Sequence, residues 1–159
     1  MEASRVDEIN DEIYKKGCIV KEKTELTGMS SLHKACQYGR LANVEKLIEE
    51  GADVNGKNHW NSTCLHWCVK GSVHNQQEKD FPGDEVYMTI AKYLISCSRK
   101  LLDQQDAQGL TPAKLAQQLN APPMQKMLEA KMSTIREEKK KAEDKRIANK
   151  PKVRRLGMY

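Results

Sequence analysis

The amino-acid sequence predicts an all-α fold: a solenoid of stacked helix-turn-helix units with hairpin-like loops, followed by an extended C-terminal helix. Three observations predict it. A Leu-His pair at 32–33 recurs 33 residues later at 65–66, which is the signature of a repeat architecture. Apolar residues then return at helical spacings of three and four. Finally, hydrophobic residues are 38% and charged residues 31% of the chain, which suits a thin stack with a solvated appendage better than a thick core.

The first unit covers residues 27–59. Its first helix places Leu32, Ala35 and Cys36 on one small apolar face. Gly39 suits the left-handed turn that ends this helix. A second helix follows with an apolar stripe of its own and ends at Gly51, after which the chain reads as an extended turn. The unit is therefore helix, tight turn, helix and loop.

The second unit, residues 60–105, keeps the Leu65-His66 pair but differs in two places. Asn61 stands where the first unit has Gly28, and Ser72 stands where the turn glycine should be. A polar insertion at about 73–86 then separates the two helices, and it contains Phe81, the only Phe in the chain. A loop of this length is either a tolerated surface segment or a partner-docking element.

The third unit, residues 106–130, begins at Asp106, and its first helix starts at Thr111-Pro112, where proline fits the first helical turn. Lys114 takes the place of the repeated histidine. At the other end of the chain, apolar residues in 1–26 share a helical face and predict a capping helix, or half repeat, before the first unit. Repeats contact only their neighbours, so such caps are needed for stability.

The Gly28-Met29-Ser30-Ser31-Leu32-His33 stretch resembles the Gly-x-Thr-Pro-Leu-His signature of ankyrin repeats, and 38–55 resembles the rest of the unit. The resemblance implies that His33 and His66 hydrogen-bond across loops in a stacking role. It also implies a non-catalytic adaptor, scaffold or small structural subunit that binds protein partners, within a larger complex, through loop tips and first helices. The residues predicted to carry these contacts are Gln37, Asn58, His59, Trp60, Trp67 and Phe81.

Residues 131–159 hold eleven of the 27 Lys and Arg residues and four of the 22 Asp and Glu residues, a net charge of +7. The other residues sum to −2, so attraction to an acidic partner should be concentrated in this basic C-terminal helix and tail. The tail is either a solubilising extension or a segment that binds RNA, a tubulin-like acidic surface or a partner subunit. The candidate contact residues are Lys139, Lys140, Lys141, Lys145, Arg146, Lys152, Arg154 and Arg155.

No constellation of residues predicts catalysis, a cofactor or a small-molecule substrate. Cys64, His66 and Cys68 have the spacing of soft metal ligands, but the repeat already accounts for all three, so we predict no metal site. Five cysteines without framework spacing and an acidic N-terminus favour a reducing compartment. We therefore expect a cytoplasmic protein, with a cytoskeletal or ciliary location as the alternative, and no membrane association.

Overall fold

The computed structural model describes residues 27–74 and 83–150. The predicted capping helix at 1–26 lies outside these ranges, as do Phe81 and the tail beyond Lys150. The elements of the described ranges are helices, so the all-α prediction is confirmed. They are α2 (Ser31–Gln37), α3 (Leu41–Glu49), α4 (Cys64–His74), α5 (Asp84–Cys97), the short 3-10 helix η2 (Arg99–Leu102), α6 (Pro112–Gln118) and α7 (Pro122–Ala148).

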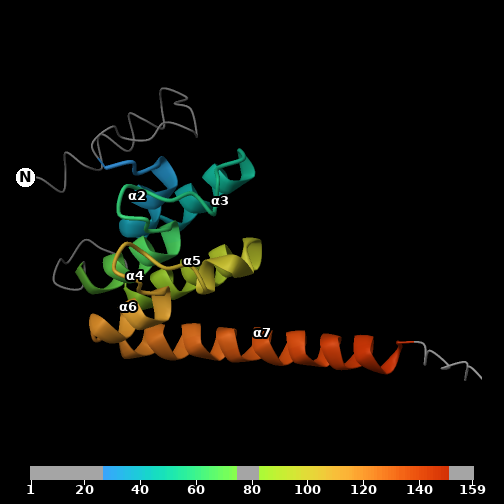
Figure 1. The fold of residues 1–159 in the computed structure, drawn as a ribbon. Coiled ribbons are helices and arrows are strands. Elements are labelled where there is room, and N and C mark those ends of the chain that lie inside the picture. The colour runs from blue at the N-terminus through green and yellow to red at the C-terminus, as the bar shows by residue number, and fades with distance from the viewer. Residues whose placement is uncertain (1–26, 75–82, 151–159) are drawn as a thin grey trace, which may run out of the picture.

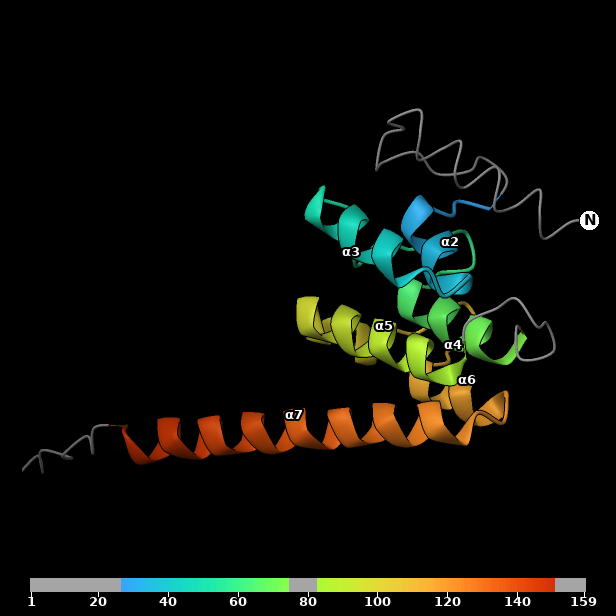
Figure 2. The same ribbon diagram turned by 180° about the vertical axis from the view of Figure 1, so that it is seen from behind.

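The helices form antiparallel pairs that stack on one another (Figure 1). The first helices α2, α4 and α6 make one row, and α2 and α6 both contact α4. The second helices α3 and α5 make the other row, and α7 takes the place of the second helix in the third unit. The view from behind shows the same order and the free end of α7 extending past the stack (Figure 2).

Short polar residues start the first helices. The Ser30 hydroxyl accepts from the His33 backbone N–H, and the His33 side chain in turn accepts from the Ser30 backbone N–H. Thr111 caps α6 by accepting from the Lys114 N–H, and Pro112 follows at the first helical position. These bonds satisfy backbone N–H groups that a helix leaves unpaired at its N-terminus. The predicted helix starts in units one and three are confirmed.

Left-handed backbone conformations mark equivalent turns. Gly39 has φ of 66° after α2, and Asn120 has φ of 55° at the corresponding point after α6. Asn61 has φ of 57°, so it adopts the conformation of Gly28, whose place it takes in the second unit. Asparagine tolerates this region better than most L-residues, which explains its use here.

The second unit departs from the predicted boundary of its insertion. Helix α4 does not turn at Ser72 but continues to His74, and α5 begins at Asp84, so the predicted 73–86 segment is helical at both ends. Ser72 is buried at 4% exposure, and its hydroxyl donates to the Val69 carbonyl at 2.8 Å. With no glycine at this position to favour a left-handed turn, the helix gains most of a further turn.

One apolar core runs through the stack. It is made of aliphatic side chains from every described helix, together with three cysteines and Tyr87. The fully buried members of largest volume include Leu32, Leu65, Tyr87, Ile90, Leu94, Leu101, Leu102 and Leu128. Leu128 belongs to α7, so the first turns of this helix are part of the core.

Helix α7 runs without a break across the predicted domain boundary at 130/131. Met124 and Leu128 are buried, and Met132 and Ile135 pack partly against the core. Beyond Ile135 all of its residues are exposed. None of the helices in the described ranges combines the length and apolarity needed to cross a membrane.

Candidate protein-binding surface

The loops between units lie on the side of the first helices, together with the row formed by α2, α4 and α6 (Figure 1). Two of these loops have the same internal construction. The Asn58 side-chain oxygen accepts from the backbone N–H groups of Trp60 and Ser62, both at 3.0 Å. In the next loop Asp106 accepts in the same way from Gln108 at 2.9 Å and Leu110 at 3.0 Å. Each loop is therefore held by one side chain folded back on its own backbone.

This construction corrects one predicted contact residue. Asn58 is only 6% exposed, and its side chain is directed into its own loop instead of toward solvent. Asparagine has a short side chain that reaches backbone N–H groups two and four residues ahead, and that bonding withdraws it from the surface. Asn58 thus positions the loop, and the residues after it are the ones displayed.

Backbone hydrogen bonds join successive loops into one row. The His59 N–H donates to the Thr27 carbonyl at 3.0 Å, and the Ala107 N–H donates to the Trp60 carbonyl at 2.8 Å. The Asn61 side chain also donates to the Gln105 carbonyl at 3.1 Å. His59 is exposed and lies against Gly28, where a Cβ would stand 2.5 Å from the imidazole Cδ2. The loop tips therefore form one connected surface.

The two repeated histidines are buried between units. His33 Nε2 lies 3.2 Å from the Ser62 carbonyl, and His66 Nε2 lies 2.8 Å from the Leu110 carbonyl. In each case the other ring nitrogen faces the helix cap, and His66 Nδ1 accepts from the Thr63 N–H at 3.2 Å. Burial lowers the pKa of His66 from the ordinary 6.5. A neutral ring that donates at one nitrogen and accepts at the other bridges the units, as the stacking role requires.

Trp60 and Trp67 form an aromatic pair on the row of loops and first helices. Their ring centroids are 6.2 Å apart, and the ring planes are tilted by 57°. Trp60 is 47% exposed, whereas Trp67 is half-buried and its indole N–H has no acceptor in the described part of the chain. The Lys70 ammonium lies 4.5 Å from the Trp67 ring centroid. Two apolar rings with a cation beside them are thus presented to solvent.

The other predicted contact residues lie apart from this pair. Gln37 is half-buried at the C-terminal end of α2, and its carbonyl accepts from the Tyr87 hydroxyl at 3.1 Å. Phe81 falls outside the described residues. The structure therefore brings together Trp60 and Trp67, with His59 next to Trp60 in the chain and directed toward Gly28. It adds Lys70, which the sequence did not single out. The signal for Lys70 was its position three residues after Trp67, which places both on one helical face.

The cysteines and His66 that resembled metal ligands have other partners. The Cys64 thiol donates to the Val54 carbonyl and the Cys68 thiol to the Tyr87 carbonyl, both at 3.2 Å. Burial, followed by the neighbouring Cys64, raises the pKa of the Cys36 and Cys68 thiols. In the described ranges no cluster of three His, Cys, Asp or Glu residues could hold a metal ion. These thiols are protonated hydrogen-bond donors within the core.

The basic residues of α7 occupy the part of the helix beyond the stack. Lys139, Lys140, Lys141, Lys145 and Arg146 are all exposed, and Lys152, Arg154 and Arg155 fall outside the described residues. Where this part begins, the Arg99 guanidinium of η2 donates to the Glu138 carboxylate at 2.6 Å and forms an exposed ion pair. By helical spacing, the packing seam of Leu128, Met132 and Ile135 continues as Lys139, Ala142 and Arg146. The seam that packs on the stack thus becomes basic where the helix leaves it.

Comparison with known proteins settles the family of this fold. A family model for ankyrin repeats, in three copies, matches residues 32–138. The chain belongs to the ankyrin-repeat family. The predicted resemblance is confirmed, and the inter-unit histidines and loops described above are those of stacked ankyrin repeats.

The curated relatives match only in part. The chain is 36% identical over 77 residues to CAP-Gly domain-containing linker protein 3 of Xenopus laevis, covering 41% of this chain and 14% of that protein. The human protein of the same name is 35% identical over the same length. Ankyrin repeat domain-containing protein 40 of Mus musculus is 48% identical over 40 residues, covering 24% of this chain and 11% of that protein. The chain therefore spans a small fraction of the length of these relatives.

Proposed function

We propose that this ankyrin-repeat protein is a non-catalytic adaptor or small structural subunit that binds a protein partner through its loops and first helices. Ankyrin repeats in general mediate protein–protein interaction, and this chain belongs to that family. The observation that carries the proposal is the Trp60–Trp67 pair on the loop surface. Of the three relatives named above, two are called linker proteins and one an ankyrin-repeat protein, and these names support the proposal.

An exposed tryptophan in a small protein is unusual enough to need a reason. Trp60 and Ile147 are the two large hydrophobic residues that stand exposed in the described ranges. Tryptophan is enriched among the residues that dominate binding energies, and it works best when surrounding contacts exclude water. The half-buried Trp67 borders Trp60 and forms part of such a rim. A partner side chain placed against this pair would remove its remaining exposed apolar area from water.

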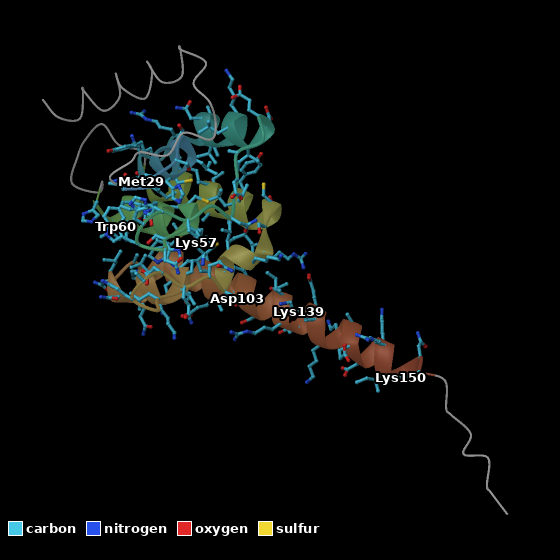
Figure 3. The ribbon with its side chains drawn as sticks, turned by 45° about the horizontal axis from the view of Figure 1, so that its top comes forward. Met29, Lys57, Trp60, Asp103, Lys139 and Lys150 are labelled. Carbon is cyan, nitrogen blue, oxygen red and sulfur yellow. The ribbon has the colours of Figure 1, made fainter. Side chains whose placement is uncertain are left out.

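The proposal includes a second, charge-driven contact through the basic end of α7. Lys150 lies at the far end of the molecule from Trp60 (Figure 3), so the two surfaces can act independently. Its occupant is an acidic surface of the host complex, and RNA and a tubulin-like surface are the alternatives. A cytoplasmic location, or a cytoskeletal or ciliary one, belongs to the same proposal.

The test is quantitative affinity capture with the full chain and Trp60→Ala, followed by identification of the retained proteins. Truncating one anchor of this kind is expected to weaken a specific partner by about 2 kcal/mol, or roughly thirtyfold. Thr89→Ala is the control, because it truncates an exposed side chain on α5, which belongs to neither proposed surface. Retention unchanged by Trp60→Ala, and also by Trp67→Ala with Phe81→Ala, would reject the surface.

The second contact has its own arm in the same experiment. Deleting 136–159 removes the basic end and leaves the packed turns of α7 in place. The deletion is expected to reduce retention of an acidic protein in a salt-dependent way. Loss of RNA retention, or of co-sedimentation with microtubules, in the deleted chain would favour the corresponding alternative. Retention of every partner at all salt concentrations would refute a role for this end.

A further inference from the structure

The loop tips and first helices are basic, although the repeat region as a whole is nearly neutral. Residues 57–74 contain Lys57 and Lys70 but no Asp or Glu. In the first unit, residues 27–37 contain Lys34 and again no acidic residue. The sequence alone does not show this segregation, because it appears only once the fold has placed these segments side by side.

The single acidic side chain in the matching segment of the third unit is directed inward. Asp106 is 8% exposed, and its carboxylate accepts two backbone N–H bonds within its own loop. Its charge is therefore largely used to hold the loop. Lys114 on the helix that follows is exposed. The third unit thus adds a cation, and no outward-facing carboxylate, to the same side of the stack.

The second helices carry the opposite charge. Glu45 and Glu49 of α3 and Glu85 of α5 are all exposed on the other side of the stack. Two further acidic residues, Asp53 and Asp103, are exposed at the start of the loops, where the chain leaves α3 and η2. The loop tips and first helices around the tryptophan pair nevertheless carry lysines and no exposed carboxylate.

The cations gather around the aromatic pair. Lys70 lies over the Trp67 ring, and the charges of Lys70 and Lys57 both act on the nearby His66 imidazole. Lys34 occupies on α2 the position that Trp67 occupies on α4, one unit away, and these two helices contact each other. Figure 3 places Lys57 and Trp60 together on the loop side, far from the basic end of α7.

We infer that the partner held on this surface is an acidic peptide segment, with an apolar side chain for the Trp60–Trp67 pair and carboxylates for Lys34, Lys57 and Lys70. The inference rests on the proposed function, and it names the chemistry of the partner at that same surface. Complementary charge raises the association rate and suppresses basic partners, while the apolar anchor supplies most of the affinity.

Single-stranded RNA fits this surface less well. A base inserted between two rings needs them nearly parallel, whereas these planes are tilted by 57°. Lys70 also lies over the ring of Trp67, whose indole is half-buried. Stacking platforms for nucleic acid instead combine accessible aromatic faces with a long groove of positive charge. The few lysines around one tilted pair match a short run of carboxylates better than a phosphate backbone.

The test is selection from a displayed library of random twelve-residue peptides on the full immobilised chain. Peptides eluted from the wild type and not from Trp60→Ala should be enriched in Asp and Glu around an apolar residue. Synthetic copies of these peptides should bind the double variant Lys34→Glu with Lys70→Glu about tenfold more weakly than the wild type. The reason is that two attractions between a lysine and a peptide carboxylate become repulsions. This loss should shrink as salt shortens the Debye length. The control is the double variant Lys92→Glu with Lys126→Glu, which changes the net charge by the same amount at positions on α5 and α7. Its peptide affinity should stay within twofold of the wild type.

The possible failures are distinguishable. The acidic partner would be refuted, and the proposed surface left intact, by either of two results. The Trp60-dependent peptides could lack an excess of Asp and Glu, or the two charge-reversed variants could lose equal amounts of binding affinity. No Trp60-dependent peptide at all would overturn the proposed surface and this inference together. Poly-uridine that binds the wild type and is released by both Trp60→Ala and the Lys34/Lys70 variant would assign the surface to nucleic acid. Circular dichroism on each variant confirms that a loss of binding is not a loss of fold.

Discussion

Gly71 lies where α4 approaches both α2 and α5, and replacing it with alanine sets two effects against each other. Alanine is favoured over glycine inside a helix by about 1 kcal/mol. A Cβ on residue 71, however, would overlap the Gln37 carbonyl oxygen and stand 2.8 Å from Cε1 of Tyr87. One of these neighbours is backbone and the other is a ring that is 1% exposed, so neither can move aside freely.

The steric overlap outweighs the helix propensity, so the substitution is expected to destabilise the protein. Inserting a methyl group into a packed interior costs roughly 1–3 kcal/mol. Separating the helices also strains the Tyr87 hydroxyl bond to the Gln37 carbonyl, 3.1 Å long, and a bond of this kind contributes about 1 kcal/mol. The gain of about 1 kcal/mol in helix propensity offsets the strained hydrogen bond but not the cost of overpacking as well. We therefore expect Gly71→Ala to destabilise the protein by about 1–3 kcal/mol, with Tm falling by roughly 2–4 °C for each kcal/mol.

Urea unfolding followed by far-UV circular dichroism measures this change. Ser133→Ala is the control, since it also introduces alanine inside a helix, but at an exposed position of α7. That variant should remain within about 0.5 kcal/mol of wild type. Tyr87→Phe should cost less in the Gly71→Ala background than in the wild type, because the bond it removes is already strained. A Gly71→Ala protein as stable as wild type would refute the close approach of α2 and α4.

Two further predictions concern the turns and the inter-unit histidine. Asn120 has φ of 55°, so Asn120→Ala should lower stability by about 1 kcal/mol in the same urea assay, whereas Asn120→Gly should not; equal losses would contradict the left-handed turn. Burial lowers the pKa of His66 from 6.5, so its contribution to stability is fully present above pH 6.5 and is lost as pH falls from 6.5 toward the folded pKa. His66→Gln should flatten this dependence in urea titrations across that range. An unchanged slope in His66→Gln would refute the assignment.

The repeat arithmetic predicted much of the fold because the units obey local rules. The offset between successive Leu-His pairs located the first helices, and the glycine positions located the turns. It also aligned Asn61 with Gly28, and the structure gives both residues a left-handed backbone conformation. The histidine bridges followed from the family resemblance and are found in the structure.

The candidate site was less predictable, because it depends on contacts between units. Tyr87 and Gln37 are separated by 50 residues, and no local pattern announces that they meet. The positive charge around the tryptophan pair is apparent only in the fold, which places Glu45, Glu49 and Glu85 on the other side of the stack. The error at Asn58 was avoidable in part. Asp106 stands at the equivalent position of the next unit, and two short side chains with the same bonding capacity suggest a shared role in the loop.

The two basic surfaces restrict what a partner can look like. Residues 136–148 extend α7 by roughly 20 Å at the helical rise of 1.5 Å per residue. This extension lies beyond the second helices, whereas Trp60 and Lys57 lie on the loop side (Figure 3). Trp60 and Lys150 lie far apart (Figure 3), so a peptide of a few residues seated against the tryptophan pair does not extend to that end of α7. If both surfaces are occupied at once, either two acidic partners are held apart or one long partner passes around the stack. An adaptor joins two partners, or two parts of one partner, whereas a simple peptide-binding module holds one segment. Simultaneous occupation of the loop surface and the basic end of α7 is therefore the property that distinguishes the two functions.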